Sequence, residues 1–279
     1  MNRSVAVVGA AGKMGQWFSR YFAKRGPVVV FDKRKVPETA GVKVADSLQD
    51  CVKDADVVFV CVPVQKTAQT VKKCSKEMKR GAVLAEISSV KSKTFSALKN
   101  TRQDLKPVCI HPMFGPGAGE QGIKILLVPV RSKPAELDLI KDLFSGADII
   151  EMADATSHDR AIAVVLGLTY LLNISYSQVL SKEDLSMLKR VGGTTFSLQS
   201  MLCESVMTDE PELMAALLKD NPYVGRYAKT FIDSASAISR LSGRKLDKKL
   251  SKAKSDIQDK ADISASYRQM YKLLDSMKK

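Results

Sequence analysis

The sequence predicts an α/β protein in which a doubly wound parallel sheet is followed by an all-helical domain. In the first half of the 279 residues, short apolar runs alternate with amphipathic segments. The runs are apolar throughout, as in parallel strands that are covered by helices on both faces of a sheet. After about residue 150 the strand pattern gives way to long helical stretches. We therefore expect a sheet domain over residues 1–152 and a helical domain over residues 153–279.

Each expected element has its own signal in the sequence. The expected strands are "SVAVVG", "PVVVFD", "DADVVFVCVP", "AVLAEIS", "KPVCIHP" and "IKILLVPV", and the first two expected helices are "KMGQWFSRYFAKRG" and "KTAQTVKKCSKEMKRG". Gly26 and Gly81 stand where these helices end, a position that glycine favours. In the second half, helices are expected over 158–180, 195–207 and 209–220, and in the C-terminal segment.

Composition favours a soluble cytoplasmic protein. The apolar run at the start is about four residues long, whereas a signal peptide needs roughly 7 to 15. The stretch from Ala161 to Ile174 is shorter than the ~20 apolar residues of a membrane-spanning helix, and we expect it to be a buried helix. The five cysteines form no CxxC motif or Cys/His cluster, so we expect neither disulfides nor a metal site.

The net charge of +14 is concentrated at the C-terminal end, where residues 229–279 hold 13 Lys or Arg against 6 Asp or Glu. A basic tail can bind nucleic acid. We favour the alternative, a solvated face of an amphipathic helix, because apolar residues recur there at helical spacing. These residues are Ile263, Tyr267, Met270, Leu274 and Met277. A nucleic-acid partner is accordingly not expected.

A glycine motif follows the first expected strand and opens the first expected helix. In "VAVVGAAGKMG", Gly9, Gly12 and Gly15 are spaced three apart. A dinucleotide pyrophosphate binds backbone N–H groups at a helix N-terminus, where side chains would block its approach. The sequence therefore predicts a Rossmann-type cofactor site that includes the glycines together with Lys13 and Met14, although the spacing departs from the usual GxGxxG.

The choice between NAD and NADP depends on the end of the second strand. Asp32 stands where a carboxylate binds the ribose hydroxyls of NAD, and it would repel a 2'-phosphate. Lys33, Arg34 and Lys35 follow it directly and would attract that phosphate. We expect NAD, with NADP as the alternative. Val62 and Pro63, at the end of "VCVP", are expected beside the nicotinamide.

Two further strand ends carry groups suited to chemistry. Ligands of open parallel sheets bind beyond the carboxyl ends of the strands. "AEISSVK" ends in Ser88 and Ser89, followed by Lys91, and "VCIHP" ends at His111, one of only two histidines. A neutral imidazole titrates near pH 6.5 and can accept a proton from a substrate hydroxyl.

These motifs together resemble the prephenate dehydrogenase family, most closely its archaeal members. "GAAGKMGQWF", "VVFVCVP", "EISSVK", "HPMFGP" and "SHDRAIAVVLGLTYLLN" occur in the order and approximate spacing of that family, from residue 4 to about 222. The resemblance implies a Rossmann domain followed by a helical dimerisation domain, and thus a homodimer. It also implies NAD(P)-dependent oxidative decarboxylation of prephenate in tyrosine biosynthesis, with arogenate as the alternative substrate.

The resemblance also implies roles for individual residues. His111 would accept or polarise the proton of the ring hydroxyl, and Ser89 would hydrogen-bond the same region. His158 falls in the family's HD motif, and we expect it to be a residue of a helix N-terminus rather than a ligand contact. Tyr170 stands where many members carry a histidine near the substrate, and a phenol can hydrogen-bond a carboxylate but adds no positive charge.

One expected group is missing. Bacterial members hold the ring carboxylate with an arginine of the helical domain, and "VGGTTFSLQSMLCESVMTDEP" has none at that place. Because the substrate is a small dicarboxylate, a cation is needed. Lys91, Arg190 and Arg226 are the candidates.

Two other functions remain open at this point. A hydroxyacid dehydrogenase or imine reductase of the same fold would carry a catalytic lysine on a helix of the second domain, and it would not explain "HPMFGP". An NAD-binding regulator would use the basic tail on nucleic acid, and its binding would be sensitive to salt.

Overall fold

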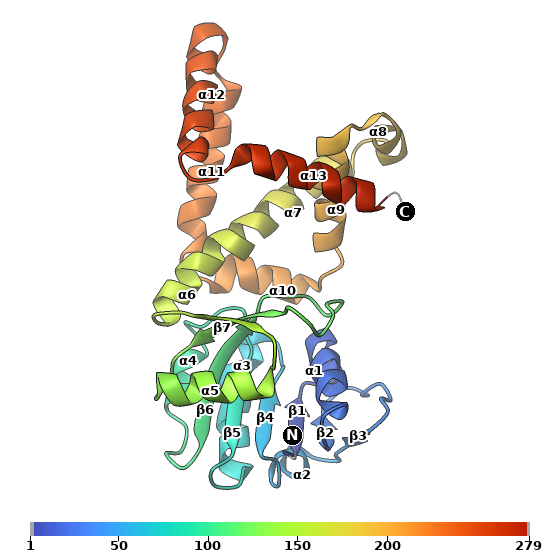
Figure 1. The fold of residues 1–279 in the computed structure, drawn as a ribbon, viewed down its shortest axis with the longest axis vertical. Helices are drawn as coiled ribbons and strands as arrows, with labels where there is room; N and C mark the ends of the chain where they lie inside the picture. The colour runs from blue at the N-terminus through green and yellow to red at the C-terminus, as the bar shows by residue number, and fades with distance from the viewer. Residues whose placement is uncertain (1–2, 278–279) are drawn as a thin grey trace.

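The computed structural model describes residues 3–277 and confirms the α/β sheet domain followed by a helical domain (Figure 1). Eight strands form one sheet in the order β3-β2-β1-β4-β5-β6-β7-β8. Their bounds are β1 Val5–Val8, β2 Val28–Phe31, β3 Val42–Val44, β4 Val57–Val60, β5 Val83–Glu86, β6 Lys106–Pro112, β7 Lys124–Val128 and β8 Asp148–Glu151. In Figure 1 the helical domain sits over the edge at which β1 and its parallel neighbours end.

The expectation of a wholly parallel sheet is wrong at one pair. β6 and β7 run antiparallel, with His111 opposite Leu126, whereas the other neighbouring pairs are parallel. A parallel return needs a crossover of a dozen or more residues, usually a helix, and the glycine-rich loop between Pro112 and Lys124 contains none. The short strands β3 and β8 were also not expected, because each has only three or four residues and exposed positions.

Helices cover both faces of the sheet and create two apolar cores. They are α1 Lys13–Ala23, α2 Leu48–Val52, α3 Val64–Glu77, α4 Phe95–Lys99 and α5 Lys133–Leu143. On one face, aromatic side chains of α1 pack on β4 and the end of α5. Phe18 lies 4.9 Å from Phe59 and 6.0 Å from Phe144, measured between ring centroids. On the other face, Leu84 and Val71 belong to the second core. Burial on both faces explains why the strands are apolar throughout.

The helical domain begins with one continuous helix of 26 residues. Its parts are α6 Ala155–Ile162, the π-helical segment η1 Ala163–Leu168 and α7 Thr169–Leu180. The rest comprises α8 Leu185–Val191, α9 Thr194–Val206, α10 Pro211–Ala215, the π-helical η2 Ala216–Asp220, α11 Val224–Ser239, α12 Gly243–Gln258 and α13 Ile263–Met277. A Cβ at Gly167 would lie 2.4 Å from Cγ2 of Val224, so glycine permits η1 and α11 to cross closely.

The expectation that the run from Ala161 to Ile174 is buried is wrong within a single chain. The exposed fractions of Val164 and Val165 are 40% and 52%, because only one side of this helix packs on its own domain. By length and composition the helix from Ala155 to Leu180 could also cross a membrane, and 22% of its most apolar window is buried. An apolar face of this extent needs a covering partner.

The basic C-terminal segment is only loosely packed. Nearly every residue of α12 is exposed, as expected for a solvated face. In α13 the expected apolar stripe is only half buried: Ile263, Met270 and Leu274 are partly buried, whereas 60% of Tyr267 is exposed. The side chain of Met277 and the last two residues lie outside the described part of the chain.

Candidate active site

The glycine turn after β1 is shaped by close backbone contacts. Gly9 has a φ of +96°, and a Cβ there would lie 2.6 Å from the carbonyl oxygen of Cys61. A Cβ on Gly15 would lie 2.2 Å from the carbonyl oxygen of Gly9. Both positions therefore need glycine, one for its backbone conformation and the other for the contact between helix and turn.

The N-terminus of α1 is open to an anion. Gly12 is its N-cap and supplies no side-chain cap, so the first amides of the helix, from Lys13 and Met14 onward, are left for another acceptor. A side-chain-free turn followed by uncapped amides fits a dinucleotide pyrophosphate. These features favour the cofactor position expected from the sequence.

Asp32 lies beside this turn, at the end of β2. Its Oδ2 accepts a hydrogen bond of 3.0 Å from the amide of Ala11, and its Oδ1 accepts one of 2.9 Å from the amide of Arg34. Each carboxylate oxygen retains acceptor capacity for a ribose hydroxyl. The Arg34 guanidinium lies over the turn, with Nη2 3.9 Å from the place of a Cβ on Gly12, and Lys33 is exposed. The structure therefore brings the expected NAD carboxylate and a cation to the same place.

The remaining expected cofactor residues differ in what they contact. Val62 packs against the second core, and Pro63 is the exposed N-cap of α3. The Lys13 side chain reaches across to the helical domain, where its ammonium donates to the carbonyl of Thr208 at 2.7 Å and lies 3.7 Å from Glu210. Lys13 thus contributes its amide to the turn and its side chain to the contact between domains.

His111 lies at the carboxyl end of β6 and is 3% exposed. Its Nδ1 is 3.0 Å from Nε2 of His158, and Nδ1 of His158 is 2.8 Å from Oδ1 of Asp159. The expectation that His158 is only a residue of a helix N-terminus is therefore incomplete: the ring is fully buried and hydrogen-bonded to the candidate base. Sequence reasoning also missed Asp159. The signal was the "SHD" segment, which opens the second domain where that domain meets the strand ends.

Burial and nearby charges keep both imidazoles neutral. Burial, followed by the neighbouring His158 and Lys91, holds the pKa of His111 well below its ordinary 6.5. Burial also lowers the pKa of His158, although Asp159 opposes this effect. Burial alone would raise the pKa of Asp159, but the hydrogen bond from His158 and those from the amides of Lys91 and Ser92 outweigh it and lower that pKa. The site at neutral pH thus holds two neutral rings and one carboxylate.

Lys91 is committed to the protein core. Its side chain is fully buried, and its ammonium donates to Oε1 of Glu86 at 2.7 Å and to the carbonyl of Ile110 at 2.6 Å. Burial alone would lower the pKa of Lys91. The Cys109 sulfur and the Glu86 carboxylate together raise this pKa by more than burial lowers it, so the net shift is upward. This geometry does not support the expected role in binding the substrate carboxylate. Lys91 instead fixes the carbonyl that directly precedes His111.

The two serines after β5 differ in burial: one is committed to the protein core and the other is not. The Ser88 hydroxyl is buried and donates to Oε2 of Glu86, and it also lies 3.0 Å from Oγ1 of Thr94. Ser89 is only partly buried. Of the pair, only Ser89 is partly exposed, and its expected role stays a prediction.

The other candidate substrate residues are Tyr170, Arg190 and Arg226. The Tyr170 hydroxyl donates to Oδ2 of Asp209 at 2.6 Å, so its proton is already given to an anion. Burial and this carboxylate raise the pKa of Tyr170. Arg190 is an exposed residue of α8, which Figure 1 shows at the end of the helical domain remote from the sheet, and Arg226 is exposed on α11. The position of Arg190 within one chain does not support the expected binding of the ring carboxylate, whereas the role of Arg226 stays a prediction.

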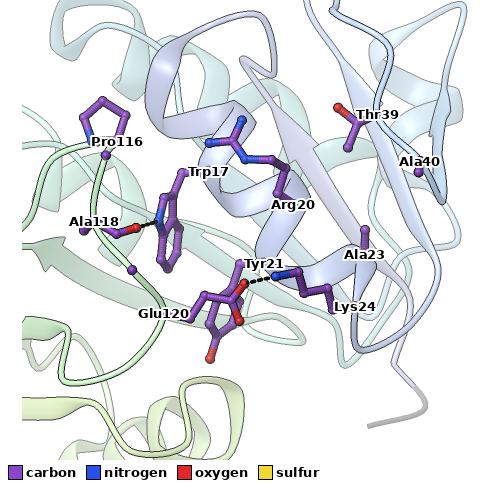
Figure 2. Close-up of a pocket in the computed structure, with 12 residues that line it drawn as sticks. Trp17, Arg20, Tyr21, Ala23, Lys24, Thr39, Ala40, Pro116, Ala118 and Glu120 are labelled. Atoms are coloured by element: carbon purple, nitrogen blue, oxygen red, sulfur yellow. Dashed lines mark hydrogen bonds and ion pairs between the residues drawn. The ribbon is translucent and has the colours of Figure 1, made fainter.

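The loop after His111 is fixed to α1 (Figure 2). The Trp17 indole N–H donates to the carbonyl of Ala118 at 3.0 Å, and Glu120 pairs with Lys24 at 2.6 Å and with Arg25 at 3.1 Å. Trp17, Lys24 and Glu120 border a hollow of about 830 Å³ along the middle and C-terminal half of α1. The glycine turn and His111 do not line this hollow, so it is separate from the candidate site. The hydrogen bond of Trp17 and the ion pairs of Glu120 connect the loop after His111 to α1, the helix that begins at the cofactor turn.

Comparison with known proteins agrees with this arrangement. Residues 26–147 match the family model "prephenate dehydrogenase, nucleotide-binding domain", and residues 154–253 match "prephenate dehydrogenase, dimerization domain". A probable arogenate/prephenate dehydrogenase of Methanocaldococcus jannaschii is 23% identical over 86% of this chain and 57% of its own length. The 4-amino-4-deoxyprephenate dehydrogenase of Streptomyces pristinaespiralis is 30% identical over 61% and 60% of the two chains. This chain thus spans less than two thirds of the length of these relatives.

Solved structures of low sequence identity share the fold. The prephenate dehydrogenase of A. aeolicus, in complex with hydroxyphenyl propionate and NAD+, has a TM-score of 0.72 at 20% identity, covering 93% of this chain and 98% of its own. The arogenate dehydrogenase of Synechocystis has a TM-score of 0.61 at 17% identity, covering 92% and 100%. Both family models match in the expected order, on the sheet domain and on the helical domain. The chain belongs to the prephenate dehydrogenase family.

Proposed function

We propose that the protein is an NAD-dependent dehydrogenase that converts prephenate to 4-hydroxyphenylpyruvate by oxidative decarboxylation. The observation that carries the proposal is the buried, neutral His111 at the carboxyl end of β6, in the same sheet edge as the glycine turn. A proton acceptor of this kind suits a substrate hydroxyl whose carbon loses a hydride. Family membership supports the same reaction.

The cofactor would be held by groups already described. The amides of Lys13, Met14 and Gly15 would bind the pyrophosphate, and the Asp32 carboxylate would bind the ribose hydroxyls. Bound NAD would supply the hydride acceptor. The complex of the A. aeolicus relative with NAD+ favours this cofactor. Arg34 at the same turn keeps NADP as the alternative.

In the proposed reaction, His111 accepts one proton from the substrate and later returns it. As the hydride leaves the ring carbon, His111 takes the proton of the hydroxyl on that carbon. The bond to the ring carboxylate breaks, carbon dioxide departs, and the electron pair of that bond completes the aromatic ring. His111 returns its proton to the phenolate oxygen, so the imidazole is neutral again at the end of the cycle. Aromatisation drives the reaction, and the protein mainly aligns the reacting groups.

Ser89 would orient the substrate hydroxyl beside His111, since it is the serine of the SVK segment that is left accessible. Arogenate is the alternative substrate because it differs from prephenate only in its side chain, away from the hydroxyl that meets His111. The names of the relatives from M. jannaschii and Synechocystis favour testing it.

We also propose that the protein is a cytoplasmic homodimer. The family model over residues 154–253 is described as a dimerization domain. The exposed apolar face of the helix from Ala155 to Leu180 supports a second copy as the covering partner.

The test is direct. Purified protein is incubated with prephenate or arogenate and with NAD or NADP, and reduced cofactor is followed by absorbance. We expect turnover with prephenate and NAD, and a fall of about 10²- to 10⁴-fold in kcat for His111→Asn. A matched control is Lys72→Ala, an exposed residue of α3 that belongs neither to the cofactor turn nor to the histidine pair. Absence of reduced cofactor with all four combinations would contradict the proposal.

A further inference from the structure

We propose that His158 and Asp159 are positioning residues that hold His111 in a single tautomer, with the proton on Nδ1 and the lone pair on Nε2. His111 would then present Nε2 to the substrate hydroxyl. The catalytic part of this inference rests on the proposed function, whereas the tautomer itself can be measured without turnover.

The chain of hydrogen bonds starts at Asp159, whose carboxylate can only accept. Its Oδ1 accepts from the amide of Lys91 at 2.9 Å, and its Oδ2 accepts from the amide of Ser92 at 2.8 Å. Backbone amides are obligatory donors, so both oxygens are fixed as acceptors and the group is ionised. The nitrogen of His158 that faces Oδ1 at 2.8 Å must therefore carry a proton.

The tautomer of His158 determines the tautomer of His111. A neutral imidazole has one N–H and one acceptor nitrogen, so a proton on Nδ1 of His158 makes its Nε2 an acceptor. That nitrogen lies 3.0 Å from Nδ1 of His111, which must donate. The lone pair of His111 is left on Nε2. In the part of the chain that the structure describes, the side chain of His111 makes no hydrogen bond other than the one to His158, so Nε2 is available.

The same chain would act during the reaction. When Nε2 takes the substrate proton, His111 becomes an imidazolium whose Nδ1–H still donates to His158. The Asp159 carboxylate, one ring further away, stabilises this positive charge. The arrangement has the logic of a catalytic triad, in which a buried carboxylate orients a histidine and does not itself take the proton. His158 and Asp159 are both fully buried, and in this proposal they act only through His111.

The small number of histidines makes the tautomer measurable. The chain has two, so protein labelled with ¹⁵N-histidine and purified without a histidine tag gives only two sets of ring signals. His158→Gln removes one set and assigns the other. At neutral pH and without substrate, we expect both rings to be neutral with the proton on Nδ1. A proton on Nε2 of His111, or a cationic ring, would overturn the proposal.

Three variants connect the tautomer to turnover. His158→Phe removes the acceptor for Nδ1, and we expect kcat to fall by about 10²-fold with little change in KM. His158→Gln can place an amide oxygen at the former position of Nε2, and it should recover most of that loss. Asp154→Ala is the matched control, because the Asp154 side chain caps the same helix through the amide of Ser157 and is not bonded to either histidine ring. The backbone carbonyl of residue 154, which accepts from the amide of His158, is kept in this variant. It should lower the melting temperature without changing the His111 signals or kcat.

These results separate the two proposals. If His111 has the expected tautomer but no substrate is turned over, the positioning role stands and the proposed function fails. If prephenate is turned over while His158→Phe keeps the wild-type kcat, the positioning role fails and the function stands. Equal losses of kcat in His158→Phe and Asp154→Ala would likewise overturn the positioning role, since they would reflect only the stability of α6.

Discussion

Replacing Lys91 with methionine separates a structural role from a substrate-binding one. The substitution keeps the length of the side chain and removes the ammonium that pairs with Glu86 at 2.7 Å. Both side chains are fully buried, so the Glu86 carboxylate would be left without its countercharge. Breaking a buried pair in this way costs about 3–5 kcal/mol of the free energy of unfolding. For a chain of this size we expect the melting temperature to fall by about 10 °C.

The assay is thermal unfolding at pH 7, followed by circular dichroism. The double variant Glu86→Gln with Lys91→Met should recover more than half of the loss, because no buried charge then remains unpaired. Lys93→Met is the matched control: that lysine is two residues away and pairs with Asp220 at the surface, where an ion pair contributes about 0–1 kcal/mol. If Lys91→Met kept its melting temperature but raised the KM for the substrate tenfold, the ammonium would be a substrate ligand and our reasoning would be wrong.

Three further predictions concern the cofactor turn, the base and the apolar helix. Gly15→Ala places a Cβ 2.2 Å from the carbonyl oxygen of Gly9, and we expect the Kd for NAD in a fluorescence titration to rise at least tenfold; an unchanged Kd would exclude the turn as the pyrophosphate site. Because the pKa of His111 lies below 6.5, kcat/KM should be constant near pH 7 and fall with acid at a midpoint below 6.5; a midpoint above that value would argue against His111 as the base. Val165→Glu should shift the sedimenting species from twice the 30.5 kDa chain mass to one copy, whereas Val44→Glu, at a similarly exposed position in the sheet domain, should not; a wild-type monomer would refute the dimer.

The sequence predicts those features of the molecule that depend on backbone conformation and on the position of a residue in a strand or turn. The glycine turn was predictable because Gly9 and Gly15 serve conformations and contacts that follow from spacing alone. His111 was predictable because the end of an apolar strand fixes where a residue lies. The antiparallel direction of β7 was not predictable. It depends on the absence of a helix between β6 and β7, and the sequence of that loop resembles an ordinary glycine-rich turn.

Side-chain direction limits prediction within the site. Sequence places Lys91 after a strand, beside the expected cleft, but not whether its ammonium points to substrate or to Glu86. The pair is hidden in the sequence because its members are five residues apart and lie on different sides of a turn. Tyr170 shows the same limit, since its partner Asp209 lies 39 residues away, in the connection between α9 and α10. Neither the sequence nor the geometry of a single chain singles out a cation that would hold the ring carboxylate of the proposed substrate.

The contact between the domains explains why the two histidines matter together. His111 belongs to the sheet domain and His158 to the helical domain, so the hydrogen bond between their rings exists only when the domains are docked. Asp159 secures that docking because its carboxylate accepts from the loop after β5, while Asn221 donates to its carbonyl at 2.8 Å. On the cofactor side, the ammonium of Lys13 reaches the helical domain from the glycine turn. A displacement of the helical domain would therefore disturb the histidine pair and the glycine turn at once, so the proposed proton acceptance by His111 requires the docked arrangement.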